Sequence, residues 1–220
     1  MRGLFVTFEG GEGSGKTTQI QRLKIWIEKN CAEFSLCITR EPGGTEDAEA
    51  IRGLLLNGLT QKWQPATEAM LISASRHEHV FHVIMPALQQ GNIVICDRFI
   101  DSTHTYQGFV GGISAVELDR LDKLSCNGLV PDLTLLLDLD SNVGLARTIE
   151  RGGSESRFEA KGKAFHQKVR QGFLARASKE PNRIVIIDAA RPPDDVARDV
   201  ISSVKQLLSA YGSKMKKPNQ

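Results

Sequence analysis

The residues best placed to do chemistry form a glycine-rich segment near the start of the chain. The segment has the spacing G-x-x-x-x-G-K-[ST], in which glycines let successive backbone N–H groups point inward around an anion. Lys16 would reach the β- and γ-phosphates of a nucleotide, and the hydroxyl of Thr17 would bind Mg²⁺. An apolar run precedes the segment and a helical pattern follows it, which is the context that such a loop needs. We therefore predict a loop that binds the phosphates of ATP, made of Gly10, Gly11, Glu12, Gly13, Ser14, Gly15, Lys16, Thr17 and Thr18.

A carboxylate and a guanidinium, Asp97 and Arg98, come directly after a second apolar run, 93–96. Ligands bind at the carboxyl ends of the strands of a parallel sheet, where Asp97 could hold Mg²⁺ through water and Arg98 could bind a second phosphate. The alternative is a surface ion pair at the end of a strand. The sequence lacks the N-K-x-D motif of a GTPase, and a motor or transport ATPase would usually be longer. The pattern favours a small phosphotransferase.

Short apolar runs alternate with helical patterns along the chain. Most of the runs are nearly continuous, as expected for parallel strands that are covered on both faces. We predict strands at 4–9, 35–39, 93–96, 133–139 and 183–187. The helical patterns lie at 16–29, 45–56, 66–90, 114–127, 141–151, 163–178 and 193–208. The alternation implies βαβ units and hence an α/β fold with a doubly wound sheet.

The composition is that of an ordinary globular protein. The 220 residues are 40% hydrophobic and 25% charged, with a net charge of +2, so there is no basic excess of the kind that suggests nucleic-acid binding. No apolar stretch approaches the ~18 residues that indicate a membrane span, and the N-terminus does not resemble a secretory signal. We expect one domain over 1–210 and a disordered polar tail over 211–220.

The chain has four cysteines, Cys31, Cys37, Cys96 and Cys126, which lie far apart and include no C-x-x-C pair. This pattern indicates reduced thiols and not a disulfide framework or a zinc site. We therefore expect a cytoplasmic protein.

Three histidines, His77, His79 and His82, form an H-x-H-x-x-H pattern that invites a metal interpretation. On the predicted helix, His77 and His79 would point about 200° apart and could not share an ion. His79 and His82 alone would make a poor zinc site. We interpret the cluster as part of a partly exposed helix surface.

Several motifs together resemble those of the bacterial thymidylate kinases. They follow the order and spacing of that family from residue 5 to about 175, and the T-R-E-P-G-G-T and D-R…Y-Q-G blocks are specific to it. The motifs are F-E-G-G-E-G-S-G-K-T-T-Q at 8–19, T-R-E-P-G-G-T at 39–45, E-A-M-L at 68–71, A-S-R at 74–76, D-R-F at 97–99 with Ser102 and Y-Q-G at 106–108, P-D-L-T at 131–134, and R-F-E at 157–159.

The resemblance implies a P-loop NTPase with the nucleoside-monophosphate-kinase fold: a five-stranded parallel sheet flanked by helices, with a short lid. It also implies transfer of the γ-phosphoryl group of ATP to dTMP with Mg²⁺, a step of dTTP synthesis for DNA replication. Proteins of this family usually form homodimers.

The same resemblance assigns residues to the acceptor nucleotide. Arg98 and Arg40 would hold the dTMP phosphate, with Glu41 orienting the arginines. Ser102 and Thr103 lie where the family crowds the 2′ position against ribonucleotides. The implied substrate-binding residues are Glu12, Arg40, Glu41, Ile72, Arg76, Arg98, Ser102, Thr103, Tyr106 and Gln107.

For the base and sugar, the resemblance implies that Arg76 and Gln107 hydrogen-bond the thymine ring and that Glu12 meets the 3′-hydroxyl. Many relatives place an aromatic residue four positions before the arginine, where this chain has Ile72. An aliphatic side chain covers a ring face without the quadrupole term, which is worth about 0.5–1.5 kcal/mol in aromatic pairs. We therefore hypothesise looser selection of the base.

The acceptor needs no general base, because the second pKa of a phosphate monoester is near ~6. The chemistry consists of bringing two anions together with Mg²⁺, Lys16 and mobile arginines. The variable positions of the glycine-rich loop, G-E-G-S at 11–14, contain no arginine, so the resemblance implies the type of enzyme in which a lid supplies it. The lid would span about 147–160, with Arg157 as first candidate, in the R-F-E motif, followed by Arg151 and Arg147. A solvated basic face is the alternative.

Two other functions stay open at this point. One is a P-loop kinase that acts on a nucleoside or on another monophosphate. The other is a nucleotide-binding regulator that keeps Lys16 and has lost the acceptor site. The presence of Arg40, Asp97 and Arg98 together with lid arginines makes the regulator the weaker of the two.

Overall fold

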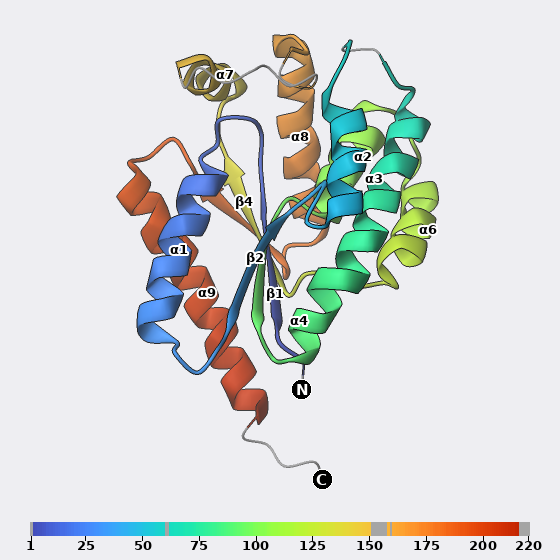
Figure 1. The fold of residues 1–220 in the computed structure, drawn as a ribbon. Coiled ribbons are helices and arrows are strands. Elements are labelled where there is room, and N and C mark those ends of the chain that lie inside the picture. Colours follow the sequence, from blue (N-terminus) through green and yellow to red (C-terminus); the bar gives the residue numbers. More distant parts are fainter. Residues whose placement is uncertain (1, 60–61, 151–157, 159, 216–220) are drawn as a thin grey trace.

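The computed structural model describes residues 2–59, 62–150, 158 and 160–215. Its centre is a sheet of five parallel strands in the order β2-β3-β1-β4-β5 (Figure 1). The strands are β1 (Leu4–Glu9), β2 (Leu36–Arg40), β3 (Ile93–Asp97), β4 (Leu133–Asp138) and β5 (Ile184–Asp188). Each predicted strand is present, within one residue at either end. The predicted α/β fold is confirmed.

Burial differs between the centre and the edges of the sheet. Strands β1, β3 and β4 are buried along almost their whole length, whereas the edge strands β2 and β5 are partly exposed. A central strand is covered on both faces and can be apolar throughout, while an edge strand alternates. The continuous apolar runs therefore mark the three strands that carry most of the core.

Helices cover both faces of the sheet (Figure 1). On one face, α1 (Lys16–Asn30) and α9 (Pro193–Met215) lie side by side and pack against β1 and β4. The other face packs against α4 (Met85–Gln89) and α8 (Lys163–Lys179). Beside these lie α2 (Glu46–Leu56), α3 (Pro65–His79) and α6 (Ala115–Cys126). No helix in the described ranges is long and apolar enough to cross a membrane.

The single helix expected over 66–90 is interrupted in the structure. Helix α3 leads into a π-helix, η1 (Val80–Ile84), which continues into α4. Pro86 in the first turn of α4 has no N–H to donate, and its ring would clash with a carbonyl of the preceding turn. The wider π turn accommodates this break. The extent of the predicted helix is correct and its regularity is wrong.

A helical segment that the sequence did not indicate follows β3. It consists of α5 (Ile100–Thr103) and a second π-helix, η2 (His104–Val110). Polar side chains, among them Thr103, Thr105 and Gln107, are buried here. Because these inward positions are polar, the segment lacks the apolar 3.6-residue repeat on which helix prediction depends.

The C-terminal helix is longer than predicted. Helix α9 continues to Met215, so the expected disorder from residue 211 onward is wrong for 211–215. The hydroxyl of Tyr211 donates to the carbonyl of Arg2 at 3.1 Å, and its ring lies edge-on to Phe34 with 6.0 Å between centroids. These contacts anchor the start of the segment that composition alone suggested was free. Residues 216–220 lie outside the described part of the chain.

The carboxyl ends of the parallel strands meet at one edge of the sheet, at the top of Figure 1. The glycine-rich loop, the end of β3 and the end of β2 lie together at this edge. Helix α7 (Ser141–Glu150) and one end of α8 lie above it. The residues predicted to bind ligands are therefore gathered at one place.

Candidate active site

The glycine-rich loop connects β1 to α1, as predicted. Three of its glycines have positive φ angles: Gly10 at 137°, Gly13 at 69° and Gly15 at 90°. A Cβ atom on Gly13 would lie 2.0 Å from the carbonyl oxygen of Gly144 in α7. The loop thus needs glycine both for its backbone conformation and for its contact with the neighbouring helix.

Lys16, the first residue of α1, is 8% exposed. Its ammonium nitrogen lies 3.2 Å from the carbonyl oxygens of Gly10 and Gly11. Burial lowers the pKa of Lys16, the positive charge of Arg98 lowers it further, and Asp97 acts in the opposite direction. A phosphate beside Lys16 would add the negative charge that stabilises its ammonium form.

A group of oxygen donors between the loop and β3 fits a magnesium ion. Asp97 ends β3, and its Oδ1 atom is buried without a hydrogen-bond partner in the described part of the chain. The hydroxyl of Ser14 is buried and unpaired among the same residues, and Thr17 is exposed. Buried polar atoms are normally satisfied, and oxygen donors are the ligands that Mg²⁺ prefers. The metal role predicted for Thr17 and Asp97 is compatible with this arrangement.

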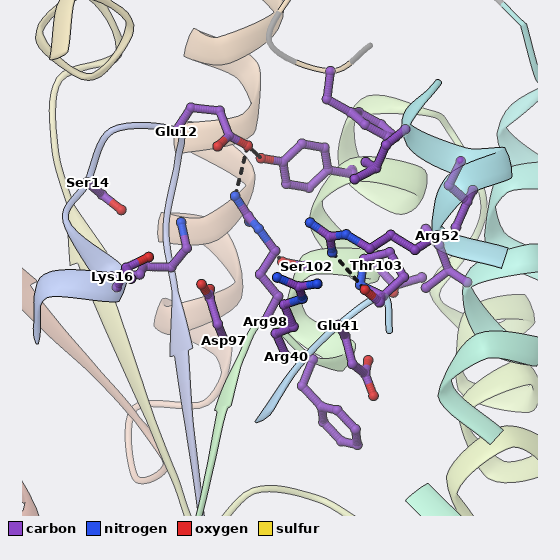
Figure 2. Close-up of a pocket in the computed structure, with 18 of the residues that line it drawn as sticks. Glu12, Ser14, Lys16, Arg40, Glu41, Arg52, Asp97, Arg98, Ser102 and Thr103 are labelled. Carbon is purple, nitrogen blue, oxygen red and sulfur yellow. Dashed lines mark hydrogen bonds and ion pairs between the residues drawn. The ribbon is translucent and has the colours of Figure 1, made fainter. Parts of the chain in front are cut away.

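Arg98 follows β3 with a φ angle of +69°, a left-handed conformation that is uncommon outside glycine. Its guanidinium lies 2.9 Å from Glu12 Oε1 and 3.1 Å from the hydroxyl of Ser102. It also lies over the ring of Tyr106, 5.4 Å from the centroid. Figure 2 shows Asp97 and Arg98 turned into the pocket. The alternative of a surface ion pair between Asp97 and Arg98 is therefore wrong.

The ion pair between Glu12 and Arg98 joins the glycine-rich loop to the end of β3. Burial by itself would lower the pKa of Arg98, but Tyr106 and Glu12 raise it above its ordinary value. Burial would raise the pKa of Glu12, but Arg98 and Lys16 lower it. Both groups are therefore charged at neutral pH, each supported by the other.

Arg76 from α3, predicted to contact the base, is 1% exposed. Its Nε donates to Glu41 at 2.7 Å, and a terminal nitrogen donates to the hydroxyl of Thr103 at 2.9 Å. The other terminal nitrogen lies 3.4 Å from Asp122, and the guanidinium lies over Phe99, 5.1 Å from the centroid. Glu41 thus orients Arg76, whereas the resemblance implied that it would orient Arg98 and Arg40. Those two arginines donate to the side chains of Glu12, Ser102 and Glu49.

His79 is completely buried, so the expected partly exposed histidine surface is wrong at this position. Its Nδ1 lies 3.1 Å from Glu41 Oε1, and its Nε2 lies 2.6 Å from the hydroxyl of Thr39. A Cβ atom on Gly44 would come within 2.3 Å of the ring. His79, from α3, thus supports the segment that follows β2. This role depends on the packing of α3 against that segment.

Two further arginines lie at the pocket. The side chain of Arg40, at the end of β2, is 56% exposed and pairs with Glu49 at 3.1 Å. Arg52, which none of the motifs includes, donates to the carbonyl of Pro42 at 2.7 Å and lines the pocket. Figure 2 shows Arg52 reaching in from α2. One signal could have found it: Arg52 lies three positions after Glu49 on the helix that follows the T-R-E-P-G-G-T block, and such residues share a helix face.

Gln107 and Ile72 line the same pocket. The Nε2 of Gln107 donates to Glu68 at 3.0 Å. Its Oε1 is buried without a partner among the described residues, so it is free to accept a hydrogen bond from an N–H group. The hydroxyl of Tyr106 lies 3.4 Å from Glu12. The predicted base contacts therefore come from α3 and η2, whereas the predicted sugar contact, Glu12, comes from the glycine-rich loop.

The pocket gathers most of the predicted site residues. Those that line it are Glu12, Gly13, Ser14, Gly15, Lys16, Thr17, Thr18, Arg40, Glu41, Ile72, Arg76, Asp97, Arg98, Ser102, Thr103, Tyr106 and Gln107. The lid candidates differ from these residues. Arg147 is not among the described residues that line the pocket, and its guanidinium lies 3.4 Å from the carbonyl of Ala189. The other two lid candidates, Arg151 and Arg157, fall outside the described residues. Phe158 lines the pocket and lies 5.8 Å from Tyr106, centroid to centroid.

A second group with metal-ligand chemistry, His104, Asp119 and Asp122, lies outside the pocket lining. His104 Nε2 is 2.8 Å from Asp122 and 3.7 Å from Asp119. Asp122 also lies 3.4 Å from Arg76. Hydrogen bonding to His104 and Arg76 accounts for this partly buried carboxylate, so we interpret the group as support for Arg76.

The sheet, the glycine-rich loop and the facing arginines define a class of protein, the P-loop kinases that hold a donor and an acceptor phosphate in one pocket. The family model for thymidylate kinase matches residues 8–200. The chain belongs to the thymidylate kinase family.

Individual relatives agree with this assignment. The chain is 47% identical to a thymidylate kinase of Caulobacter vibrioides, over 94% of this chain and 98% of that protein. It is 48% identical to a thymidylate kinase of Magnetococcus marinus, over 93% of this chain and 97% of that protein. The crystal structure of thymidylate kinase from Ehrlichia chaffeensis is similar, with a TM-score of 0.74, 34% identity, and coverage of 93% of this chain and 100% of that chain. The chain is an enzyme that phosphorylates dTMP to dTDP with ATP.

Proposed function

We propose that the two walls of the pocket divide this reaction between donor and acceptor. The loop over 10–18 and Lys16 hold the phosphates of ATP, and Arg98 with Arg40 and Arg52 holds the phosphate of dTMP. The observation that carries this proposal is the placement of Lys16 and Arg98 in one pocket, with Asp97 and Glu12 beside them (Figure 2). Two anions can approach each other only where such positive groups surround them.

Arg98 is poised to change partners when dTMP binds. Its guanidinium bonds to Glu12, and a phosphate carrying about two negative charges is the stronger partner for an arginine. Transfer of Arg98 to the phosphate would free Glu12 to accept a hydrogen bond from the 3′-hydroxyl of the sugar. One movement would thus form two substrate contacts.

On the base side, the unpaired Oε1 of Gln107 would accept the N3–H of thymine, while Ile72 covers a ring face. Arg76 would act from its fixed position beside Glu41 and Thr103. Because several fixed polar groups bind the base, an analogue lacking one contact leaves a buried group unpaired. We infer that this wall sets the preference for dTMP.

Transition-state charge is stabilised from three directions. Mg²⁺, held by Thr17 and through water by Asp97, would neutralise charge on the β- and γ-phosphates of ATP. Lys16 contributes from the loop. A lid arginine, with Arg157 ranked first, contributes from the opposite side, as the resemblance to lid-arginine thymidylate kinases implies.

A substrate panel tests the assignment. Turnover is measured in a coupled assay with dTMP, dUMP, dCMP, dGMP and thymidine as acceptors. We expect the highest kcat/KM with dTMP and no turnover of thymidine, which lacks the acceptor phosphate. Preference for another monophosphate would support the alternative of a different P-loop kinase. Tight ATP binding without turnover of any acceptor would support the regulator.

We also propose that the chain forms a homodimer, as the resemblance implies, and that it is cytoplasmic, as its cysteine pattern indicates. Exposed apolar side chains on neighbouring helices, among them Leu54, Met70 and Leu124, support an association surface. Light scattering coupled to size exclusion tests the dimer, and a monomer mass would contradict it.

A further inference from the structure

Glu9, the last residue of β1, has no part in the mechanism above although it lies directly before the glycine-rich loop. Its side chain is 0% exposed. The Oε1 atom accepts from the backbone N–H of Phe99 at 2.8 Å and from that of Ser102 at 3.1 Å. The Oε2 atom accepts from the hydroxyl of Ser102 at 2.6 Å. One carboxylate thus holds both ends of the turn that follows Arg98.

The hydroxyl of Ser102 connects this carboxylate to the Arg98 guanidinium, which lies 3.1 Å away. When Glu9 is ionised, the direction of the chain is fixed by chemistry, because an ionised carboxylate only accepts and a guanidinium only donates. Ser102 must therefore donate its single proton to Glu9 and accept from Arg98. The guanidinium is aligned by a chain that begins at a buried carboxylate.

The backbone at Arg98 needs such support. A left-handed conformation is unfavourable for a residue with a Cβ atom, and Arg98 has a φ of +69°. Its N–H donates to the carbonyl of Phe8 at 2.9 Å on the preceding side. On the following side, the N–H groups of Phe99 and Ser102 are held by Glu9. The turn is thus fixed to β1 at both ends.

We propose that Glu9 is the positioning residue for Arg98: through Ser102 and the backbone of the turn, it presents the guanidinium to the phosphate of the acceptor nucleotide. The inference deepens the proposed function and rests on the role of Arg98 in it. Glu9 itself touches no substrate.

Keeping the Glu9 carboxylate buried costs stability, as expected for a residue that is present to position another. Burial and the neighbouring Asp101 raise the pKa of Glu9, whereas Arg98, the Ser102 hydroxyl and the Phe99 N–H lower it. Asp101 is in turn paired with Arg176 from α8 and with Arg183, the residue before β5. An apolar residue would avoid the cost of a buried carboxylate, and it could not accept these three hydrogen bonds.

The variant Glu9→Gln tests the inference because it keeps the shape and one accepting oxygen while replacing Oε2 by a group that cannot accept from Ser102. We expect kcat/KM for dTMP to fall about tenfold, with the KM for ATP changed by less than about twofold. In an Arg98→Ala background, Glu9→Gln should change kcat/KM by less than about twofold, because the aligned group is already absent. Full additivity of the two changes, or an equal rise in both KM values, would overturn the proposal.

Three further measurements separate positioning from general damage. Asp101→Asn alters another buried carboxylate on the same turn, and we expect a lower Tm with kcat/KM for dTMP within about twofold of wild type. A loss equal to that of Glu9→Gln would overturn the inference. If Glu9→Gln does not fold, Ser102→Ala interrupts the same chain, and its loss of about threefold or more should disappear in the Arg98→Ala background. Wild-type kinetics of Arg98→Ala alone would instead refute the proposed function.

Discussion

The two walls of the pocket are built in opposite ways. The donor wall is one continuous stretch, 10–18, whose action depends on backbone conformation and on glycines with positive φ. The acceptor wall is assembled from the ends of β2 and β3 and from α2, α3, α5 and η2. Two of its arginines are held by buried carboxylates, Arg76 by Glu41 directly and Arg98 by Glu9 through Ser102. A backbone cradle is local, whereas a set of charged side chains needs partners from elsewhere in the fold. Changes in the two walls should therefore have different signatures.

The largest effect is expected in the donor wall, for Lys16→Ala. The variant should lower kcat by at least ~10³-fold, because a buried cation beside the transferring group acts in the transition state. The Tm should change little, since within the described part of the chain the ammonium donates its hydrogen bonds to loop carbonyls alone. Steady-state kinetics and a thermal melt check both parts, and turnover within about tenfold of wild type would contradict the role.

Arg157→Ala should come next, with kcat lower by at least ~10²-fold and dTMP affinity almost unchanged, because the contact strengthens in the transition state. Arg157 is outside the described residues, and this prediction rests on its motif. Arg147→Ala is the matched control, since Arg147 reaches the carbonyl of Ala189, and its kcat should fall less than about tenfold. Near-wild-type turnover of Arg157→Ala would refute the assignment.

The acceptor wall should show its dependence on buried pairs in Arg76→Met. Removing this guanidinium leaves Glu41 buried and without its 2.7 Å partner, which should destabilise the fold by about 3–5 kcal/mol. Arg40→Met removes an exposed pair with Glu49 and should change stability by about 0–1 kcal/mol. Urea unfolding of both variants measures the contrast. Equal losses would mean that the two arginines are held alike.

The Glu9 carboxyl should make stability depend on pH. Burial, followed by Asp101, raises its pKa from 4.5 to about 7 in the folded protein, so the folded state binds this proton more tightly than the unfolded chain. The contribution of Glu9 to stability is therefore largest below 4.5 and is lost as the pH rises through about 7. The Tm of Glu9→Gln relative to wild type should increase from about pH 5 to about pH 8. A relative decrease over this range would reverse the sign.

The smallest effect is expected at Ile72, where the acceptor wall covers the base. Ile72→Phe restores an aromatic face worth about 0.5–1.5 kcal/mol, so discrimination of dTMP from dUMP should improve by about two- to tenfold. The measurement is the ratio of kcat/KM values for the two nucleotides in both proteins. The same ratio in wild type and variant would mean that Ile72 does not loosen base selection.

The sequence was most informative where function depends on neighbouring residues. The strands follow from short apolar runs, and the phosphate loop follows from glycine spacing, since both depend on local backbone preferences. The motifs also identified most residues that line the pocket. They missed Arg52, which lies on a predicted helix but outside the motifs, and the helical stretch at 100–110, which carries no periodic apolar signal.

The sequence by itself determined the α/β fold, the donor loop and the family to which the chain belongs. Only the tertiary structure decided that His79 lies behind Glu41, that Arg98 is turned toward Glu12, and that Glu9 holds the turn after β3. Glu9 and Phe99 are 90 positions apart in the chain. Such contacts depend on which strands become neighbours in the sheet and which helix packs across their ends, and no local pattern of residues encodes them.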